Sequence, residues 1–168
     1  MILLKIRSVL IALAVLNAAP SRAAILGSDA AACANPTASA VLVRVEGFKA
    51  RTGMLRVQVY GGNPADWLAK GKKLRRIELP VTASGYMDVC IAVPGPGKYA
   101  IAVRHDVDGS GKSGWDDGAA FSRNPSLSLL HLKPDFEKVV IPVGQVPREI
   151  GVVLNYRSGF SIRPVGKN

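Results

Sequence analysis

The feature that most constrains this chain is a period-two alternation of apolar and polar residues, which runs from Thr37 to Tyr156. Successive side chains of a β-strand point to opposite faces, so this pattern predicts strands with one buried and one exposed face. Strands of parallel sheets are buried on both faces and lack such alternation. We therefore expect mainly antiparallel strands, in the segments 41–46, 55–60, 76–81, 87–93, 99–104, 139–143 and 150–156.

Turn signals separate these segments, and the chain holds 17 glycines and 11 prolines. About seven short strands at this spacing are typical of an all-β fold, an antiparallel β-sandwich of the immunoglobulin or transthyretin type. One short helix is predicted at 63–70, because Asn63 can cap its N-terminus and Pro64 suits its first turn.

The N-terminus has the three parts of a secretory signal peptide. Lys5 and Arg7 give a positive start, an apolar stretch follows at 9–16, and small residues lead to a predicted cleavage site after Ala23. The apolar stretch is shorter than the ~20 residues that a membrane-spanning helix needs. We therefore expect a periplasmic or secreted protein with no membrane span once the signal peptide is removed.

Four parts of the chain follow from these patterns: a signal peptide at 1–23, an N-terminal extension at 24–38, a β-sandwich domain at 39–157 and a C-terminal tail at 158–168. Two cysteines, Cys33 and Cys90, remain after cleavage. Because an even pair in an oxidising compartment indicates a disulfide bond, we expect a bridge from the extension to a central strand.

The chain is basic, with a formal net charge of +10. Such a surface attracts nucleic acid, anionic lipid or acidic polysaccharide, and export argues against nucleic acid. The only dense basic run is Lys70–Arg76. We interpret it as a solvated surface, and a polysaccharide-binding face is the alternative.

The segment richest in chemistry follows the strand predicted at 99–104. Counting from Asp106, oxygen-bearing side chains occupy positions 1, 3, 5 and 12, and Gly111 occupies position 6, where a calcium loop turns sharply. The predicted calcium ligands are Asp106, Asp108, Ser110, Lys112 through its carbonyl oxygen, and Asp117. The alternative is a glycine-rich turn whose aspartates make only local hydrogen bonds.

Three residues beside these ligands are further candidate site residues: His105, Trp115 and Asp116. His105 with a neighbouring aspartate, or with His131, would fit an enzyme or a transition-metal site. The alternative is that His105 makes a hydrogen bond at the end of its strand. Because the chain has no Gly-x-Ser-x-Gly elbow, His-Glu-x-x-His motif or phosphate loop, we favour a protein without catalytic activity.

Two motifs carry a family resemblance. The first runs from Gly97 through His105-Asp106-Val107-Asp108 to Lys112, and the second is Phe121-Ser122-Arg123-Asn124. The chain resembles, from about Val41 to Tyr156, the bacterial family called domain of unknown function 2141. The resemblance implies an exported β-sandwich and no particular activity. The segment Trp115–Gly118 departs from the Pro/Glu segment of that family.

Together these patterns predict an exported β-sandwich that binds a small molecule, a glycan or an envelope partner near the segment 106–117, with calcium as the candidate cofactor. One rival is a periplasmic enzyme that uses His105 with nearby aspartates. The other is an envelope module that binds polysaccharide through Lys70–Arg76.

Overall fold

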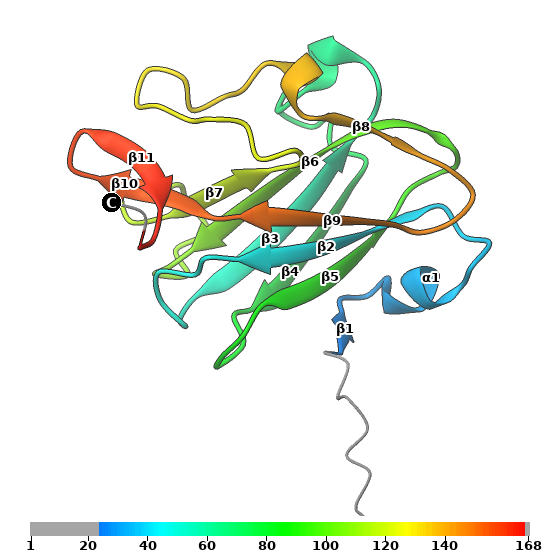
Figure 1. Cartoon of the computed structure of the whole chain (residues 1–168), viewed down its shortest axis with the longest axis horizontal. Coiled ribbons are helices and arrows are strands. Elements are labelled where there is room, and N and C mark those ends of the chain that lie inside the picture. Colours follow the sequence, from blue (N-terminus) through cyan, green and yellow to red (C-terminus); the bar gives the residue numbers. More distant parts are fainter. Residues whose placement is uncertain (1–23, 167–168) are drawn as a thin grey trace, which may run out of the picture.

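The computed structural model describes residues 24–166, so the predicted signal peptide lies outside the described residues. Two β-sheets are stacked face to face (Figure 1). The smaller sheet has the strand order β1-β5-β2-β9, in which the strands span Ile25–Leu26, Met87–Ala92, Ala40–Glu46 and Arg148–Val153.

The larger sheet has the order β11-β10-β7-β6-β3-β4, and β8 also pairs with β6. Its strands span Ser161–Pro164 (β11), Asn155–Ser158 (β10), Gly118–Phe121 (β7), Gly97–Asp106 (β6), Met54–Tyr60 (β3), Arg75–Pro80 (β4) and Val140–Val143 (β8). The all-β sandwich is thereby confirmed. Its pairing is mostly antiparallel, and β2–β9 and β1–β5 are parallel.

The predicted alternation places the core between the sheets. Val41, Val43 and Val45 of β2 are fully buried, whereas Arg44 and Glu46 between and beyond them are exposed. On β6, Ile101 and Val103 join the same core, so Arg104 lies on the outer face of the larger sheet. The hydrophobic face of each strand is therefore the one that its sequence pattern indicates.

The segment predicted as one strand at 150–156 is shared between the two sheets. β9 pairs with β2 in the smaller sheet, and β10 pairs with β7 and β11 in the larger one. The chain crosses at Leu154, which is fully buried and donates its N–H to the carbonyl oxygen of Glu46 at 2.9 Å. The tail at 158–168 contributes β11, which forms a hairpin with β10.

The helical elements differ from the prediction. At 63–70 the chain makes only a 3₁₀ turn, Pro64–Asp66, which the Asn63 side chain caps by accepting the N–H of Ala65 at 3.1 Å. Burial of Trp67 explains the early end, because its indole donates to the carbonyl oxygen of Pro134 at 2.8 Å and its backbone is extended. A second 3₁₀ turn is Phe136–Lys138, and the α-helix of residues 24–166 is α1, Ala30–Ala34.

A second apolar cluster covers part of the outer face of the larger sheet. Trp67 packs edge-on against Tyr60, Phe121 and Phe136, with ring centroids 5.2–6.4 Å apart. Ala100 and Ala102 of β6 lie beneath these rings in the same cluster. None of the helices at residues 24–166 has the length and apolar character that a bilayer crossing requires.

Candidate functional site

The candidate site begins where β6 ends. Because side chains alternate along the strand, Arg104 and Asp106 share the outer face of the sheet and His105 points to the core. The chain then turns back toward β7 through residues 107–117. Gly109 and Gly111 in this turn have φ angles of +67° and +77°, which favour glycine over any other residue.

Asp106 organises the turn from inside. Its carboxylate is buried, and it accepts the N–H of Ser110 at 3.1 Å and of Gly111 at 2.8 Å. Arg104 donates to the same carboxylate at 3.0 Å. The loop therefore wraps around one buried negative charge that the strand itself supplies.

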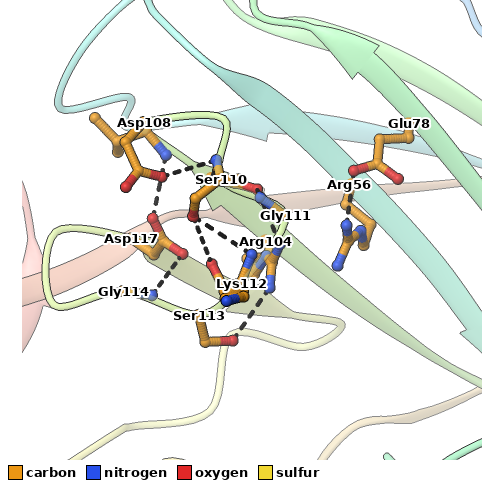
Figure 2. Close-up of polar contacts among 12 residues, drawn as sticks. Arg56, Glu78, Arg104, Asp108, Ser110, Gly111, Lys112, Ser113, Gly114 and Asp117 are labelled. Atoms are coloured by element: carbon orange, nitrogen blue, oxygen red, sulfur yellow. Dashed lines mark hydrogen bonds and ion pairs between the residues drawn. The ribbon is translucent and has the colours of Figure 1, made fainter.

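Two other aspartates converge on Asp106. Asp108 accepts the N–H of Ser110 at 3.0 Å, and hydrogen bonds from Ser110 hold the pKa of this carboxyl below its usual value. Asp117 accepts the N–H groups of Val107 at 3.2 Å and Gly114 at 3.0 Å (Figure 2). One carboxylate oxygen from each of Asp106, Asp108 and Asp117 lies within 4.8 Å of the others. The structure thus brings together three of the predicted calcium ligands.

The remaining two predicted ligands contact one another. The hydroxyl of Ser110 donates to the carbonyl oxygen of Lys112 at 3.4 Å, and the N–H of Lys112 lies 3.4 Å from the same hydroxyl. Both residues belong to the loop that Asp106 and Asp108 fold, so their oxygens lie on the same turn as the carboxylates. The alternative prediction is a glycine-rich turn whose aspartates make local hydrogen bonds. The hydrogen bonds from the loop N–H groups to Asp106, Asp108 and Asp117 are of this kind.

Arg104 is a site residue that the sequence analysis missed. Besides Asp106, its guanidinium binds the hydroxyl of Ser113 at 3.1 Å, and its Nε is buried without a hydrogen-bond partner among the described residues. Its cross-strand neighbour is Arg56, which pairs with Glu78 at 2.7 Å and lowers the pKa of that carboxyl. The spacing Arg104-x-Asp106 on a strand was the available signal, since residues two apart share a face.

His105 does not join the carboxylates. It is fully buried, with Nδ1 2.6 Å from the Tyr156 hydroxyl and Nε2 2.8 Å from the carbonyl oxygen of Thr52. A carbonyl oxygen only accepts hydrogen bonds, so Nε2 carries the proton and Nδ1 accepts from Tyr156. Burial raises the pKa of Tyr156 to about 12, which keeps that donor protonated. The other histidine, His131, lies on the exposed segment 127–132.

The other two candidate site residues lie on the outer side of the loop. Trp115 is 74 % exposed, and the guanidinium of Arg157 from β10 lies 3.6 Å from the centre of its ring. Asp116 pairs with Lys49 at 2.7 Å and does not belong to the carboxylate cluster. Trp115 is not a carboxylate ligand, but it lies beside the cluster, because it and Asp117 line the same hollow of the surface.

Much of the basic run at 70–76 is paired. Lys72 contacts Asp66 at 3.4 Å, Arg75 contacts Asp29, and Arg76 lies 4.0 Å from Glu78. Carboxylates of the protein thus already neutralise part of the charge that a polysaccharide would bind.

A cavity of about 360 Å³ opens beside the loop, over β7 and the β10–β11 hairpin. Its walls are Trp115 from the loop, Ile162 from β11, and three leucines of the segment that follows β7, Leu127, Leu129 and Leu132. Arg104, Asn155 and Arg157 are the polar residues of its lining that lie on strands. Sequence patterns did not indicate this cavity, because its walls come from segments far apart in the chain.

Comparison with known protein families places most of the sandwich in a bacterial family. The family model described as an uncharacterized protein conserved in bacteria (DUF2141) matches residues 43–150. No curated protein and no solved structure gives a significant match to the chain. The matched range includes β6, the converging aspartates and the segment 127–132, and it spans more than half of the sequence. The chain belongs to this bacterial family.

Proposed function

We propose that this member of the DUF2141 family is an exported, non-enzymatic β-sandwich protein whose loop at 106–117 binds Ca²⁺ and holds a ligand-binding surface in place. The observation that carries the proposal is the convergence of Asp106, Asp108 and Asp117 within 4.8 Å. Ca²⁺ binds oxygens at about 2.3–2.6 Å, so oxygens on opposite sides of one ion lie about 4.6–5.2 Å apart. The spacing of the three carboxylates fits one such ion.

The hydrogen bonds within the loop are compatible with an ion. Each carboxylate oxygen has two lone pairs, so an oxygen that accepts one N–H can also face a cation. The N–H groups of Ser110 and Gly111 hold the Asp106 carboxylate in place. Bonds of this kind fix the oxygens before the ion arrives, which lowers the entropy lost on binding.

The nearby positive charges set the expected affinity. Arg104 pairs with Asp106 at 3.0 Å, and Lys112 lies within the loop. Both charges weaken the attraction for a cation, so we expect a dissociation constant of about 10⁻⁴–10⁻³ M, as in extracellular calcium modules. A site of this strength is occupied outside the cell, where it adds stability.

Two features support export. The sequence of residues 1–23 has the pattern of a signal peptide, and the sulfur atoms of Cys33 and Cys90 lie at disulfide distance, 2.04 Å. Disulfide bonds persist outside the reducing cytoplasm. The absence of catalysis is supported by His105, whose two ring nitrogens are occupied in the core by Tyr156 and Thr52.

Thermal unfolding of the chain without residues 1–23, first in EGTA and then with increasing CaCl₂, tests the calcium site. At ten times the dissociation constant, calcium stabilises the folded state by about 1.4 kcal/mol, which raises the midpoint by roughly 3–6 °C. Asp108→Asn removes a charged ligand and should abolish most of this rise.

The matched control is Asp116→Asn, which removes a carboxylate from the same loop but outside the cluster. It should keep the full response to calcium. If the native protein melts at the same temperature in EGTA and in 10 mM CaCl₂, or if both variants respond equally, the calcium site does not exist.

A further inference from the structure

The cavity beside the loop has the dimensions of a small-molecule site. Its volume of about 360 Å³ falls within the range of about 300–1,000 Å³ that ligand pockets occupy. Ala119 of β7 lies at the sheet surface beneath it, and the loop, the β10–β11 hairpin and the segment 127–132 surround it. Figure 1 shows the hairpin as the end of the larger sheet next to β7, where the long connection that follows β7 also begins.

The walls are apolar and in contact with solvent. Trp115 is 74 % exposed and Leu132 is 55 % exposed, although both line the cavity. An apolar surface in water is unfavourable by about 25 cal/mol per Å², so a ligand that covers these side chains gains free energy. Contiguous exposed apolar surface of this kind marks binding sites on soluble proteins.

Two guanidinium groups give the cavity its charge. Arg104 donates to the hydroxyl of Ser113 (Figure 2) and to the carboxylate of Asp106, and its buried Nε has no partner among residues 24–166. Arg157 is held by the carbonyl oxygen of Gly159 at 3.0 Å and by the ring of Trp115. Both charges are thus positioned before any ligand binds, and a fixed guanidinium is well suited to a carboxylate.

The one carboxylate of the lining is already engaged. Asp117 accepts N–H groups from Val107 and Gly114 with its two oxygens. It also belongs to the calcium cluster, where a bound ion would offset its charge. The charged group of the lining that has no carboxylate partner among residues 24–166 is therefore Arg157, and Arg104, which already pairs with Asp106, can offer a ligand only its remaining N–H groups.

From this arrangement we infer that the cavity binds a small amphipathic carboxylate, with its carboxylate at Arg104 and Arg157 and its apolar body against Trp115 and the leucines of 127–132. The inference deepens the proposed function, since Trp115 and Asp117 lie on the proposed calcium loop. It also gives calcium a role, because neutralising the three aspartates raises the affinity for an anion.

Isothermal titration with octanoate tests the inference, and octanamide serves as a neutral probe of the same shape. We expect octanoate to bind at least about tenfold more tightly than octanamide, because a hydrogen bond between a guanidinium and a carboxylate is stronger than one to a neutral amide. Neither probe absorbs where tryptophan does, so a blue shift of the tryptophan emission gives a second measurement; the change should come from the exposed Trp115, because Trp67 is already buried.

Arg157→Gln should weaken octanoate binding about tenfold or more and leave octanamide binding unchanged. The matched control, Arg163→Gln, removes the same charge from the same hairpin outside the cavity and should bind octanoate as the native protein does. Equal affinities for octanoate and octanamide, or equal affinities in the two variants, would overturn the inference.

The calcium proposal and the carboxylate inference can fail separately. Octanoate binding that is the same in EGTA and in CaCl₂, with no calcium response in melting, rejects calcium and retains the cavity. A calcium response in melting without octanoate binding at 10 mM rejects the cavity. Binding to phosphatidylglycerol vesicles without binding to octanoate would also overturn it, in favour of a membrane surface.

Discussion

At the scale of single residues, His105 and Asp106 of β6 have different structural roles because their side chains lie on opposite faces of the larger sheet. Asp106 faces outward and folds the loop, while His105 faces inward and links Thr52 to Tyr156. Tyr156 is packed tightly here, because a Cβ added to Gly118 would lie 2.4 Å from its ring. The histidine therefore fixes the position of β10, and with it the hairpin that forms one wall of the cavity.

Tyr156→Phe tests this role of His105. The substitution leaves the buried Nδ1 of His105 without its donor, and an unsatisfied buried group costs about 1–3 kcal/mol. The control is Tyr99→Phe, whose hydroxyl donates to Gly95 at a partly buried turn and should cost about 0.5–1.5 kcal/mol. Urea unfolding at pH 7 measures both. An equal or smaller loss for Tyr156→Phe would show that the His105 contact is not structural.

At the scale of elements, the N-terminal extension is bound to the sandwich in three ways. β1 adds to the edge of β5 in parallel, the sulfur atoms of Cys33 and Cys90 lie at disulfide distance, and Asp29 accepts the N–H of Ala92 at 2.9 Å. Asp29 also pairs with Arg75 of β4, so the extension contacts strands of both sheets. The segment thus forms part of the fold.

The stability that the Asp29 carboxylate contributes should be measurable by unfolding the protein at acidic pH. Burial raises the pKa of Asp29, but the hydrogen bonds from Arg75 and from the N–H of Ala92 outweigh burial and lower the pKa below the ordinary 3.8. A carboxyl with a lowered folded pKa stabilises the protein above its unfolded pKa, and this contribution is lost as the pH falls through the folded value. Asp29→Asn should therefore be less stable at pH 7 and lose less stability between pH 5 and pH 2.

The control for this profile is Asp66→Asn, which breaks the exposed pair with Lys72. Exposed pairs contribute about 0–1 kcal/mol, so its unfolding free energy should follow that of the native protein at every pH. If the native protein and Asp29→Asn lose stability in parallel below pH 5, the carboxylate of Asp29 does not hold the extension.

At the scale of the whole molecule, the sequence predicts those features that depend on residues close together in the chain. Alternation predicted which faces of β2, β3 and β6 are buried, and the spacing of the aspartates located the loop. The pairing of strands far apart in the chain could not be predicted from the sequence, because nothing near β2 indicates its parallel neighbour β9. The helix at 63–70 was overestimated because local capping signals compete with the burial of Trp67. The cavity could not be predicted for the same reason, because its walls come from segments that are far apart in the chain.

The motif Phe121-Ser122-Arg123-Asn124 joins the two sheets. Ser122 is fully buried, where its Oγ accepts the N–H of Ile101 at 3.0 Å and donates to the carbonyl oxygen of Val139 at 2.5 Å. Asn124 reaches the other sheet: its Nδ2 donates to Gly151 at 2.9 Å, and its Oδ1 accepts the N–H of Val153 at 2.9 Å. These two bonds satisfy the backbone of β9 just before the chain crosses into β10.

Substitution of Asn124 should therefore loosen the junction between the sheets. The φ angle of Asn124 is +47°, which glycine adopts without strain. Asn124→Gly therefore preserves the backbone conformation and removes only the side-chain amide. We expect this variant to lose about 1–3 kcal/mol of unfolding free energy and to exchange the Val153 amide faster in hydrogen–deuterium exchange. Asn124→Asp keeps the acceptor for Val153 and loses the donor to Gly151, so its Val153 amide should stay protected. If Asn124→Gly leaves the exchange of the Val153 amide as slow as in the native protein, the two hydrogen bonds of Asn124 do not hold β9 in place.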